Sequence, residues 1–338
     1  MSAVTYGREL LRIENLRVYY PVKRTIEEVL GRKQRFLRAV DGVSFTVSRG
    51  EIVALVGESG SGKTTVARAI VGLVKPTSGK IFFDGLSLTD MKPGDMKRLR
   101  RRIQMVFQDP TVSLNPRMRV GAQLEFPLMV NGVDSKKERR DAALEALKTV
   151  GLTPPEDFYT RYPHQLSGGQ RQRVAIARAL VLKPEFLIAD EPISNIDVSA
   201  RAQILNLLRE IRSDMGLSML YITHDLSSAW AIADKVAVMY LGKIVEYGDV
   251  DQVFSNPLHP YTKALLSSVP SLTPKQTTTR RILLPGEVPN AIDPPGGCRL
   301  HPRCPYASNL CATLEPELTD VGKGHLVACH LYSHHEEK

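Results

Sequence analysis

Residues 57–64 of the chain read GESGSGKT and match the pattern G-x-x-x-x-G-K-[ST]. The residues before this loop, IVALV at 52–56, form a continuously apolar run, which is typical of a parallel strand buried on both faces. The residues after it, TTVARAIVGLV at 64–74, place apolar side chains at helical spacing. A strand, a glycine-rich loop and a helix in this order predict a phosphate-binding loop in an α/β protein.

The chemistry of such a loop predicts nucleotide binding. Its glycines let backbone N–H groups converge on phosphates, and the N-terminus of the following helix adds its positive dipole end. Lys63 is expected to reach the β and γ phosphates, and Thr64 to hold Mg²⁺. The loop alone does not separate kinases, GTPases and helicases from other nucleotide-binding classes. The residues predicted to bind the nucleotide here are Gly57, Glu58, Ser59, Gly60, Ser61, Gly62, Lys63, Thr64 and Thr65.

Length and composition limit the class of protein. A chain of 338 residues with 43% hydrophobic and 24% charged residues predicts one large globular domain with a smaller one attached. No window approaches the roughly 18–20 continuous apolar residues that span a bilayer, and the first residues lack the apolar core of a secretory signal. We therefore expect a cytosolic chain. The net charge of +9 suits a polyanionic partner without choosing among nucleotide, nucleic acid and anionic lipid.

Two adjacent acids follow a second buried strand. Asp190 ends the apolar run FLIAD at 186–190, and Glu191 comes next. A carboxylate at the end of such a strand is placed at a sheet edge beside the phosphate loop, where it can orient the Mg²⁺ shell. A carboxylate one residue further on can polarise a water molecule as a general base. Either acid alone could cap a helix, but the adjacent pair favours a catalytic site.

A second anion site is predicted at residues 166–173, which read LSGGQRQR. A serine and two glycines stand immediately before the helical sequence QRQRVAIARALV, so another helix N-terminus is prepared for phosphate. The chain already has one phosphate loop, so the second site is explained if it serves a nucleotide held by another subunit. With this feature the chain resembles the ATP-binding cassette (ABC) ATPase family over residues 10–255.

The resemblance implies a role for each motif. Ser167, Gly168, Gly169 and Gln170 look like the signature motif, Gly57 to Thr65 like Walker A, Asp190 like Walker B, Gln108 like the Q-loop, Glu191 like the catalytic carboxylate and His224 like the switch histidine. It implies a catalytic set of Glu191, His224 and Gln108, and Mg²⁺ ligands at Thr64, Gln108 and Asp190. Tyr20 is placed like the aromatic residue that stacks on adenine, although Tyr19 is adjacent. The D-loop corresponds to SNID at 194–197, where the two middle residues depart from the usual pattern but Asp197 is kept.

The resemblance also implies the architecture. It predicts a P-loop NTPase with a RecA-like core, an antiparallel β subdomain and a helical subdomain at about 109–170, all within a nucleotide-binding domain of residues 1–250. The pattern itself predicts strands at 12–20 and 43–56 as hairpin arms around a turn at Gly50, and a helix at 135–150 ended by Gly151. Residues 21–38, rich in Lys and Arg, predict an extended insertion, and the basic cluster at 97–102 a solvated helix face.

The four cysteines all lie in the predicted C-terminal extension, residues 251–338, at Cys298, Cys304, Cys311 and Cys329. Such clustering in an otherwise thiol-free cytosolic body argues for a metal site over disulfides. The spacing lacks the C-x-x-C pairs of zinc ribbons, and four thiolates suit a [4Fe–4S] cluster. Zn²⁺ and free thiols remain the alternatives.

HPYTKALL at 259–266 and GCRLHPRCPYA at 297–307 resemble the C-terminal extension of oligopeptide and dipeptide transporter ATPases, some of which carry an iron-sulfur cluster. Histidines of this region, at 301, 325 and 330, could join a mixed site but are expected to be plain surface residues. The resemblance implies an importer ATPase that uses ATP and Mg²⁺, with peptides ranked before oligosaccharides as cargo.

The resemblance implies a set of partners at the cytoplasmic face of a membrane. They are a second ABC ATPase subunit, two transmembrane permease subunits and, indirectly, an extracellular solute-binding protein. The insertion at 21–38 suggests that the two ATPase subunits are not identical, although a homodimer stays open. A soluble ABC ATPase working on DNA or ribosomes is the runner-up, but the single cassette and the importer-like tail argue against nucleic acid. A small-molecule kinase would leave LSGGQ unexplained.

Overall fold

The computed structural model describes residues 8–22, 34–194, 196–269 and 282–332. The chain divides into two compact units, each assembled from several segments. Unit 1 consists of Met1–Leu10, Val47–Ile52 and Asp90–Ile222. Unit 2 consists of Leu11–Thr46, Val53–Thr89 and Thr223–Lys338. In the described part of the chain, no helix is long and apolar enough to cross a membrane.

Unit 2 contains a four-stranded sheet in the order β2-β1-β4-β5, whose strands are β1 (Glu9–Pro21), β2 (Phe36–Ser48), β4 (Ser78–Phe83) and β5 (Leu86–Ser87). β4 pairs antiparallel with both β1 and β5. Leu11 and Ile13 of β1 are buried, and after a register shift between Glu14 and Arg17 the strand continues with buried Val18. The irregularity keeps the apolar side chains of β1 on the core face.

The remaining strands of unit 2 lie in the order β11-β12-β10-β9-β3. They are β3 (Ile52–Val56), β9 (Lys235–Tyr240), β10 (Lys243–Asp249), β11 (Thr319–Asp320) and β12 (Leu326–Val327). β3 pairs parallel with β9, and every residue of β3 is buried. β12 pairs antiparallel with β10, with Val327 opposite Glu246, so the C-terminal hairpin extends the same sheet.

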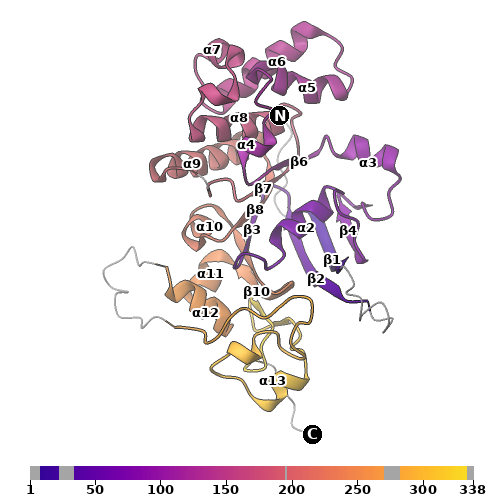
Figure 1. The fold of residues 1–338 in the computed structure, drawn as a ribbon, viewed down its shortest axis with the longest axis vertical. Coiled ribbons are helices and arrows are strands. Elements are labelled where there is room, and N and C mark those ends of the chain that lie inside the picture. The colour runs from indigo at the N-terminus through magenta and orange to yellow at the C-terminus, as the bar shows by residue number, and fades with distance from the viewer. Residues whose placement is uncertain (1–7, 23–33, 195, 270–281, 333–338) are drawn as a thin grey trace. The chain divides into compact units, whose positions relative to one another are not determined.

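The helices of unit 2 are short. They are α2 (Lys63–Ile70), α10 (Leu226–Ile232), α11 (Val250–Ser255), α12 (Pro260–Ser267), the 3₁₀ turn His301–Arg303 and α13 (Asn309–Thr313). α2 begins directly after the glycine-rich loop. The C-terminal region with α13, in yellow, lies on the side of unit 2 where α12 and β10 are drawn (Figure 1).

Unit 1 combines three parallel strands with a group of helices. β6 (Ile103–Val106), β7 (Phe186–Asp190) and β8 (Ser218–Thr223) pair in parallel with β7 in the middle. The helices are α3 (Pro93–Leu99), α4 (Pro110–Ser113), α5 (Val120–Val130), α6 (Lys136–Thr149), α7 (Pro155–Thr160), α8 (Gly168–Leu180) and α9 (Val198–Met215), with a 3₁₀ turn at Pro163–Gln165. α5, α6 and α7 pack against one another beside α8 (Figure 1).

The structure confirms the predicted helix at 135–150, since α6 starts after an N-cap at Ser135 and ends before Gly151. The predicted hairpin around Gly50 is wrong. β2 neighbours β1 in the four-stranded sheet, whereas β3 pairs in parallel with β9. Gly50, at φ +72°, therefore joins strands of two different sheets.

Two basic segments also differ from expectation. β2 begins at Phe36, so the predicted insertion is shorter than 21–38, and its residues 23–33 lie outside the described part of the chain. Arg102, at the end of the basic cluster, does not belong to a solvated helix face. Its Nη2 donates to Oε2 of Glu185 at 2.8 Å, and the ion pair lowers the pKa of Glu185.

Candidate nucleotide-binding site

The glycine-rich loop of unit 2 depends on positive φ angles and close backbone approach. Gly57, Gly60 and Gly62 have φ angles of +149°, +80° and +108°. A Cβ on Gly57 would lie 2.1 Å from the carbonyl oxygen of Met239, and one on Gly62 would lie 2.1 Å from that of Ala39. No side chain fits at these two positions, so the motif requires glycine there for steric reasons.

Lys63 is folded onto the loop that precedes it. Its Nζ donates to the carbonyl oxygens of Gly57 at 2.7 Å and Glu58 at 2.8 Å, and to Oγ of Ser61 at 3.3 Å. Lys63 is 5% exposed, so its ammonium group is largely removed from water. Gly62 is the N-cap of α2, so the loop leads into a helix N-terminus, whose positive dipole end favours an anion.

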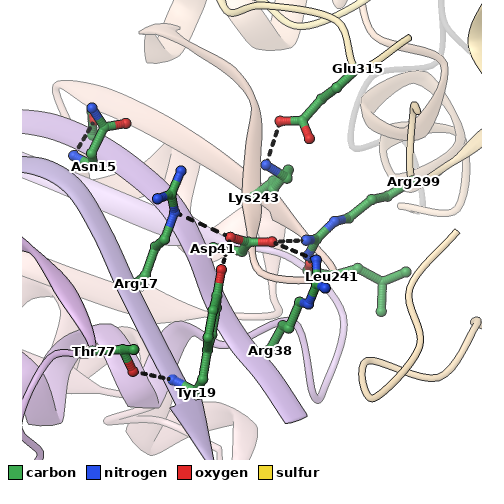
Figure 2. Close-up of polar contacts among 11 residues, drawn as sticks. Asn15, Arg17, Tyr19, Arg38, Asp41, Thr77, Leu241, Lys243, Arg299 and Glu315 are labelled. Atoms are coloured by element: carbon green, nitrogen blue, oxygen red, sulfur yellow. Dashed lines mark hydrogen bonds and ion pairs between the residues drawn. The ribbon is translucent and has the colours of Figure 1, made fainter. Parts of the chain in front are cut away.

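The two adjacent tyrosines of β1 have different surroundings. The hydroxyl of Tyr19 donates to the carboxylate of Asp41, and burial together with this hydrogen bond raises the pKa of Tyr19 (Figure 2). Burial alone would raise the pKa of Asp41, but Tyr19 and the charge of Arg299 hold it below its usual value. Successive residues of a strand face opposite sides, and Tyr20 is half-buried on the other face.

The carboxyl ends of the paired parallel strands β6 and β7 carry two of the predicted catalytic residues, Gln108 after β6 and Glu191 after β7. Nε2 of Gln108 donates to Oε2 of Glu191 at 2.8 Å. Glu191 has a φ of +46°, a left-handed conformation that costs energy for a residue with a side chain. Its carbonyl oxygen accepts from Oγ of Ser194 at 3.0 Å, which helps to hold this conformation. Asp190, one residue earlier, is 2% exposed.

The signature residues form the start of α8. Oγ of Ser167 accepts from the backbone N–H of Gln170 at 3.3 Å, and Oε1 of Gln170 accepts from the N–H of Ser167 at 3.0 Å. This capping box satisfies two backbone N–H groups at the helix start. Ser167, Gln170 and Asp197 line one cavity of about 500 Å³ within unit 1. Asn195, in the middle of the predicted D-loop, lies outside the described residues.

His224 lies in unit 2, directly after β8 and before α10. The carboxylate of Asp225 caps α10 by accepting from the N–H groups of Ser227 and Ser228, so the short turn that carries His224 is fixed at both ends. His224 is exposed at the carboxyl end of its strand. This position agrees with a residue that contacts a ligand above the sheet.

All four cysteines belong to the described residues, and none of them takes part in a disulfide there. They line one cavity of about 130 Å³: Cys298, Cys304, Cys311 and Cys329. Burial raises the pKa of Cys298 to about 11 and also raises the pKa values of Cys304 and Cys329. Among the described residues, no three His, Cys, Asp or Glu side chains converge closely enough to hold a single metal ion.

The histidines near the cysteines do not all behave as expected. His325 was expected at the surface but is 2% exposed, and its Nε2 lies 2.7 Å from Oε1 of Glu246. Glu246 is completely buried on β10 and pairs with this tail residue. His301 contacts the carbonyl oxygen of Cys298 at 2.9 Å, and the half-buried His330 contacts that of Leu314 at 2.9 Å.

Two residues that contact the predicted site, Tyr261 and Arg303, were not predicted from the sequence. Tyr261 accepts a hydrogen bond from the N–H of Glu58 in the glycine-rich loop, and Arg303 lies 3.9 Å from the carboxylate of the same residue. Tyr261 belongs to the HPY sequence and Arg303 to HPRC, so both were visible in motifs. No local pattern indicates a contact between residues that are about two hundred positions apart.

The site combines the features of an ABC ATPase: a buried strand, a phosphate loop, a second helix start that is rich in glycine and capped, and a strand that ends in acidic residues. The family model described as ABC transporter matches residues 40–194, and the model described as oligopeptide/dipeptide transporter, C-terminal region, matches residues 245–311. The chain belongs to the ATP-binding proteins of ABC transporters and carries this C-terminal region. It is an ATPase whose hydrolysis of ATP drives transport.

The relatives share most of their length with this chain. The dipeptide transport ATP-binding protein DppF of Escherichia coli is 48% identical and aligns with 96% of this chain and 95% of its own. The oligopeptide transport ATP-binding protein AppF of Bacillus subtilis is 45% identical over 96% of this chain and 98% of its own. Among solved structures, the dimeric bacterial ABC transporter cassette MJ0796 is 32% identical, with a TM-score of 0.62 over 71% of this chain and 99% of its own.

Proposed function

We propose that this chain is the ATPase subunit of a peptide importer. The observation that carries the proposal is the presence in one chain of a folded phosphate loop and of the C-terminal region that its peptide-transporting relatives share. DppF and AppF are named for dipeptide and oligopeptide transport. No feature of the described residues favours oligosaccharides over peptides as cargo.

We infer the following roles in ATP hydrolysis. Lys63 holds the β and γ phosphates, and its desolvated ammonium group supports this role. Glu191 positions the attacking water, and Gln108 orients the Glu191 carboxylate through the 2.8 Å hydrogen bond between them. His224 contacts the γ phosphate. Tyr20 stacks on adenine, since the hydroxyl of Tyr19 is bound to Asp41.

The Mg²⁺ ligands in this proposal are Thr64, Gln108 and Asp190. All three offer the oxygen donors that Mg²⁺ prefers, and the carboxylate of Asp190 stands at the carboxyl end of the buried strand β7. When bound, Mg²⁺ supplies positive charge next to the transferred phosphate. Residues 167–170 and Asp197 would be lent to the nucleotide of a second subunit, and the cavity of about 500 Å³ that Ser167, Gln170 and Asp197 line supports this role.

The domain limits and partners belong to the same proposal. Residues 1–250 form the nucleotide-binding domain, with a helical subdomain at about 109–170, and residues 251–338 form the C-terminal extension. The working complex contains a second, non-identical ATPase subunit and two permease subunits at the cytoplasmic face of a membrane, and it receives peptides from an extracellular binding protein. Co-purification from native membranes tests these partners, and a complex without a permease would contradict the proposal.

The role of Glu191 is tested by Glu191→Gln. The variant keeps the size of the side chain but removes its general base, so we expect steady-state ATP turnover to be lost while ATP-dependent dimerisation is kept. Phosphate release and analytical ultracentrifugation measure the two properties. Glu185→Gln, at the other end of β7, is the matched control and should retain turnover. Turnover of Glu191→Gln at the wild-type rate would contradict the assignment.

We further propose that Cys298, Cys304, Cys311 and Cys329 hold a [4Fe–4S] cluster. The four thiols line one cavity of about 130 Å³, and four cysteine thiolates are the ligand set of such a cluster. Bound metal would also reverse the effect of burial on the thiol pKa values. Anaerobic purification followed by iron and sulfide analysis tests this. Stoichiometric zinc without visible absorption would show that the zinc alternative is correct.

A further inference from the structure

The C-terminal region contacts the phosphate loop through the hydroxyl of Tyr261. This residue of α12 is completely buried, and its Oη accepts a hydrogen bond from the backbone N–H of Glu58 at 2.9 Å. Nζ of Lys63 donates to the carbonyl oxygen of the same Glu58 at 2.8 Å. Tyr261 and Lys63 therefore hold the two sides of one loop residue. All three residues belong to unit 2.

A second contact to Glu58 comes from Arg303. Its Nη1 lies 3.9 Å from Oε2 of Glu58, a buried oxygen that has no hydrogen-bond partner in the described part of the chain. Nη1 of Arg303 also lies 3.4 Å from Oη of Tyr240, and the ring of Tyr240 packs on Tyr261 with 4.6 Å between centroids. The two contacts therefore form one packed group behind the first turn of the loop.

Arg303 belongs to a short segment, residues 298–304, that begins and ends with cysteine. Near the start of this segment, Arg299 makes a second set of contacts with unit 2. Arg299 donates to the carboxylate of Asp41 and to the carbonyl oxygen of Leu241 (Figure 2). Asp41 of β2 also accepts from Tyr19 of β1. The segment thus connects the cysteine cavity to the phosphate loop through Arg303, and to Asp41 of β2, the partner of Tyr19, through Arg299.

We propose that Tyr261 and Arg303 are positioning residues for ATP binding, through which the cysteine-bearing segment sets the conformation of the phosphate loop. The inference rests on the proposed role of residues 57–64 as the phosphate site of ATP. A loop fixed before the nucleotide arrives loses less conformational entropy on binding, so contacts that hold Glu58 increase affinity without touching the phosphates. The chemical step itself does not involve either side chain.

The first test is Tyr261→Phe in the full-length chain. This change removes the acceptor of the Glu58 N–H and keeps the buried ring, so we expect MgATP to bind about fivefold more weakly, the equivalent of one neutral hydrogen bond. In the assembled ATPase, KM for ATP should rise by a similar factor while kcat stays near the wild-type value. Fluorescent-nucleotide titration and steady-state kinetics measure these quantities.

Tyr247→Phe is the matched control. The hydroxyl of Tyr247, on β10 of the same unit, donates to the carbonyl oxygen of Thr46 at 3.3 Å, away from the phosphate loop. Like Tyr261→Phe, this variant loses one hydrogen bond made by a tyrosine hydroxyl. It should therefore lower thermal stability without changing the affinity for MgATP. An equal loss of affinity in Tyr247→Phe and Tyr261→Phe would reduce the role of Tyr261 to general stability and overturn the proposal.

The second test is a double-mutant cycle between Arg303 and Glu58. Arg303→Gln and Glu58→Gln each break the ion pair, so the double variant should bind MgATP no more weakly than the weaker-binding single variant. Arg303→Lys, which keeps the positive charge, should recover part of the affinity. Glu315→Gln removes an ion pair between the tail and Lys243 and is the control that should bind normally. Additive effects of the two single changes would contradict a contact between them.

Lys63→Ala separates failure of this inference from failure of the proposed phosphate site. Wild-type affinity for MgATP in Lys63→Ala would show that residues 57–64 do not bind the nucleotide, and both proposals would fall. A second outcome would contradict the positioning role alone. In that case Lys63→Ala loses MgATP binding, but Tyr261→Phe and Arg303→Gln bind MgATP within twofold of the wild-type affinity. Loss in all three supports it.

Discussion

At the scale of single residues, the phosphate loop contains two kinds of glycine. Gly60 and Gly62 both have positive φ angles, so a side chain strains the backbone at either position. They differ in their surroundings. A Cβ on Gly62 would lie 2.1 Å from the carbonyl oxygen of Ala39 and 2.8 Å from Cε of Met239, whereas a Cβ on Gly60 would meet no atom within 4 Å. Strain and steric exclusion can therefore be separated.

We predict that Gly62→Ala lowers the free energy of unfolding by more than about 2 kcal/mol, because strain and overlap with a backbone carbonyl add together. Gly60→Ala, the matched variant, carries only the strain and should cost about 1 kcal/mol. Urea unfolding without nucleotide measures both. Equal losses in the two variants would show that contact with Ala39 does not matter.

The residues that sequence predicted well are those whose chemistry is local. Lys63 follows from an eight-residue motif, and Asp190 from the apolar strand that it ends, so each needs only a few neighbours to be recognised. Tyr261 and Arg303 could not be predicted as neighbours of Glu58, because their contacts depend on the packing of a tail about two hundred residues away. The prediction that His325 is exposed is wrong for the same reason. Its partner Glu246 lies 79 positions earlier, so the burial of His325 depends on packing that its neighbours in sequence do not indicate.

At the scale of elements, two helices of unit 1 begin with a serine whose side chain caps the helix, but the two serines have different surroundings. Oγ of Ser167 accepts from the N–H of Gln170 at the start of α8, and Oγ of Ser135 accepts from the N–H of Glu138 at the start of α6. Ser167 lines the cavity that also contains Asp197. The two caps therefore allow the stability of a helix start to be distinguished from its role in catalysis.

We predict that Ser167→Ala and Ser135→Ala each lower the free energy of unfolding by about 1 kcal/mol, the usual cost of losing a serine cap. Ser167→Ala should in addition lower ATP turnover severalfold, because its hydroxyl and the helix start are proposed to face the phosphates of a second subunit. Turnover of Ser135→Ala should stay at the wild-type level. Denaturant unfolding and phosphate release give the comparison, and equal turnover in the two variants would argue against a signature role for Ser167.

Helices and strands could be predicted where the periodicity of apolar residues and the capping residues define them. They were misplaced where their position depends on which strands pair in a sheet. The run 52–56 is apolar throughout and became β3, and Ser135 and Gly151 bound α6 as their capping chemistry requires. The predicted hairpin around Gly50 is wrong because β2 and β3, although adjacent in sequence, belong to different sheets. β3 is buried on both faces and pairs in parallel with β9, which lies about 180 residues later in the chain. A local sequence pattern cannot predict such a distant partner strand.

At the scale of the whole molecule, a buried carboxylate joins the C-terminal region to the core of unit 2. Glu246 of β10 is completely buried and accepts from the N–H groups of Leu258 at 2.8 Å and His259 at 2.9 Å. Its third partner is Nε2 of His325, at 2.7 Å. The start of α12 and the β11–β12 hairpin are therefore held by one side chain, whose charge is compensated by several hydrogen bonds.

His259 makes this arrangement sensitive to acid. It is 1% exposed, and its Nδ1 accepts from the N–H of Tyr261 at 3.1 Å, so that nitrogen carries no proton. Burial lowers the pKa of His259 to about 4, from 6.5, against an opposing effect of Glu246. Between these values the unfolded chain binds a proton that the folded chain does not, so the free energy of unfolding decreases as the pH falls from about 6.5 toward 4.

We predict that this one residue removes about 2 kcal/mol of stability between pH 7 and pH 5, a range that covers most of the interval between the two pKa values. His259→Asn offers a side-chain oxygen to cap α12 but cannot titrate, so its stability should fall less over the same range. Urea unfolding of the full chain at both pH values gives the difference between the two proteins. If the free energy of unfolding falls by the same amount in both proteins, acid destabilises the chain through other groups, and protonation of His259 does not cause the loss.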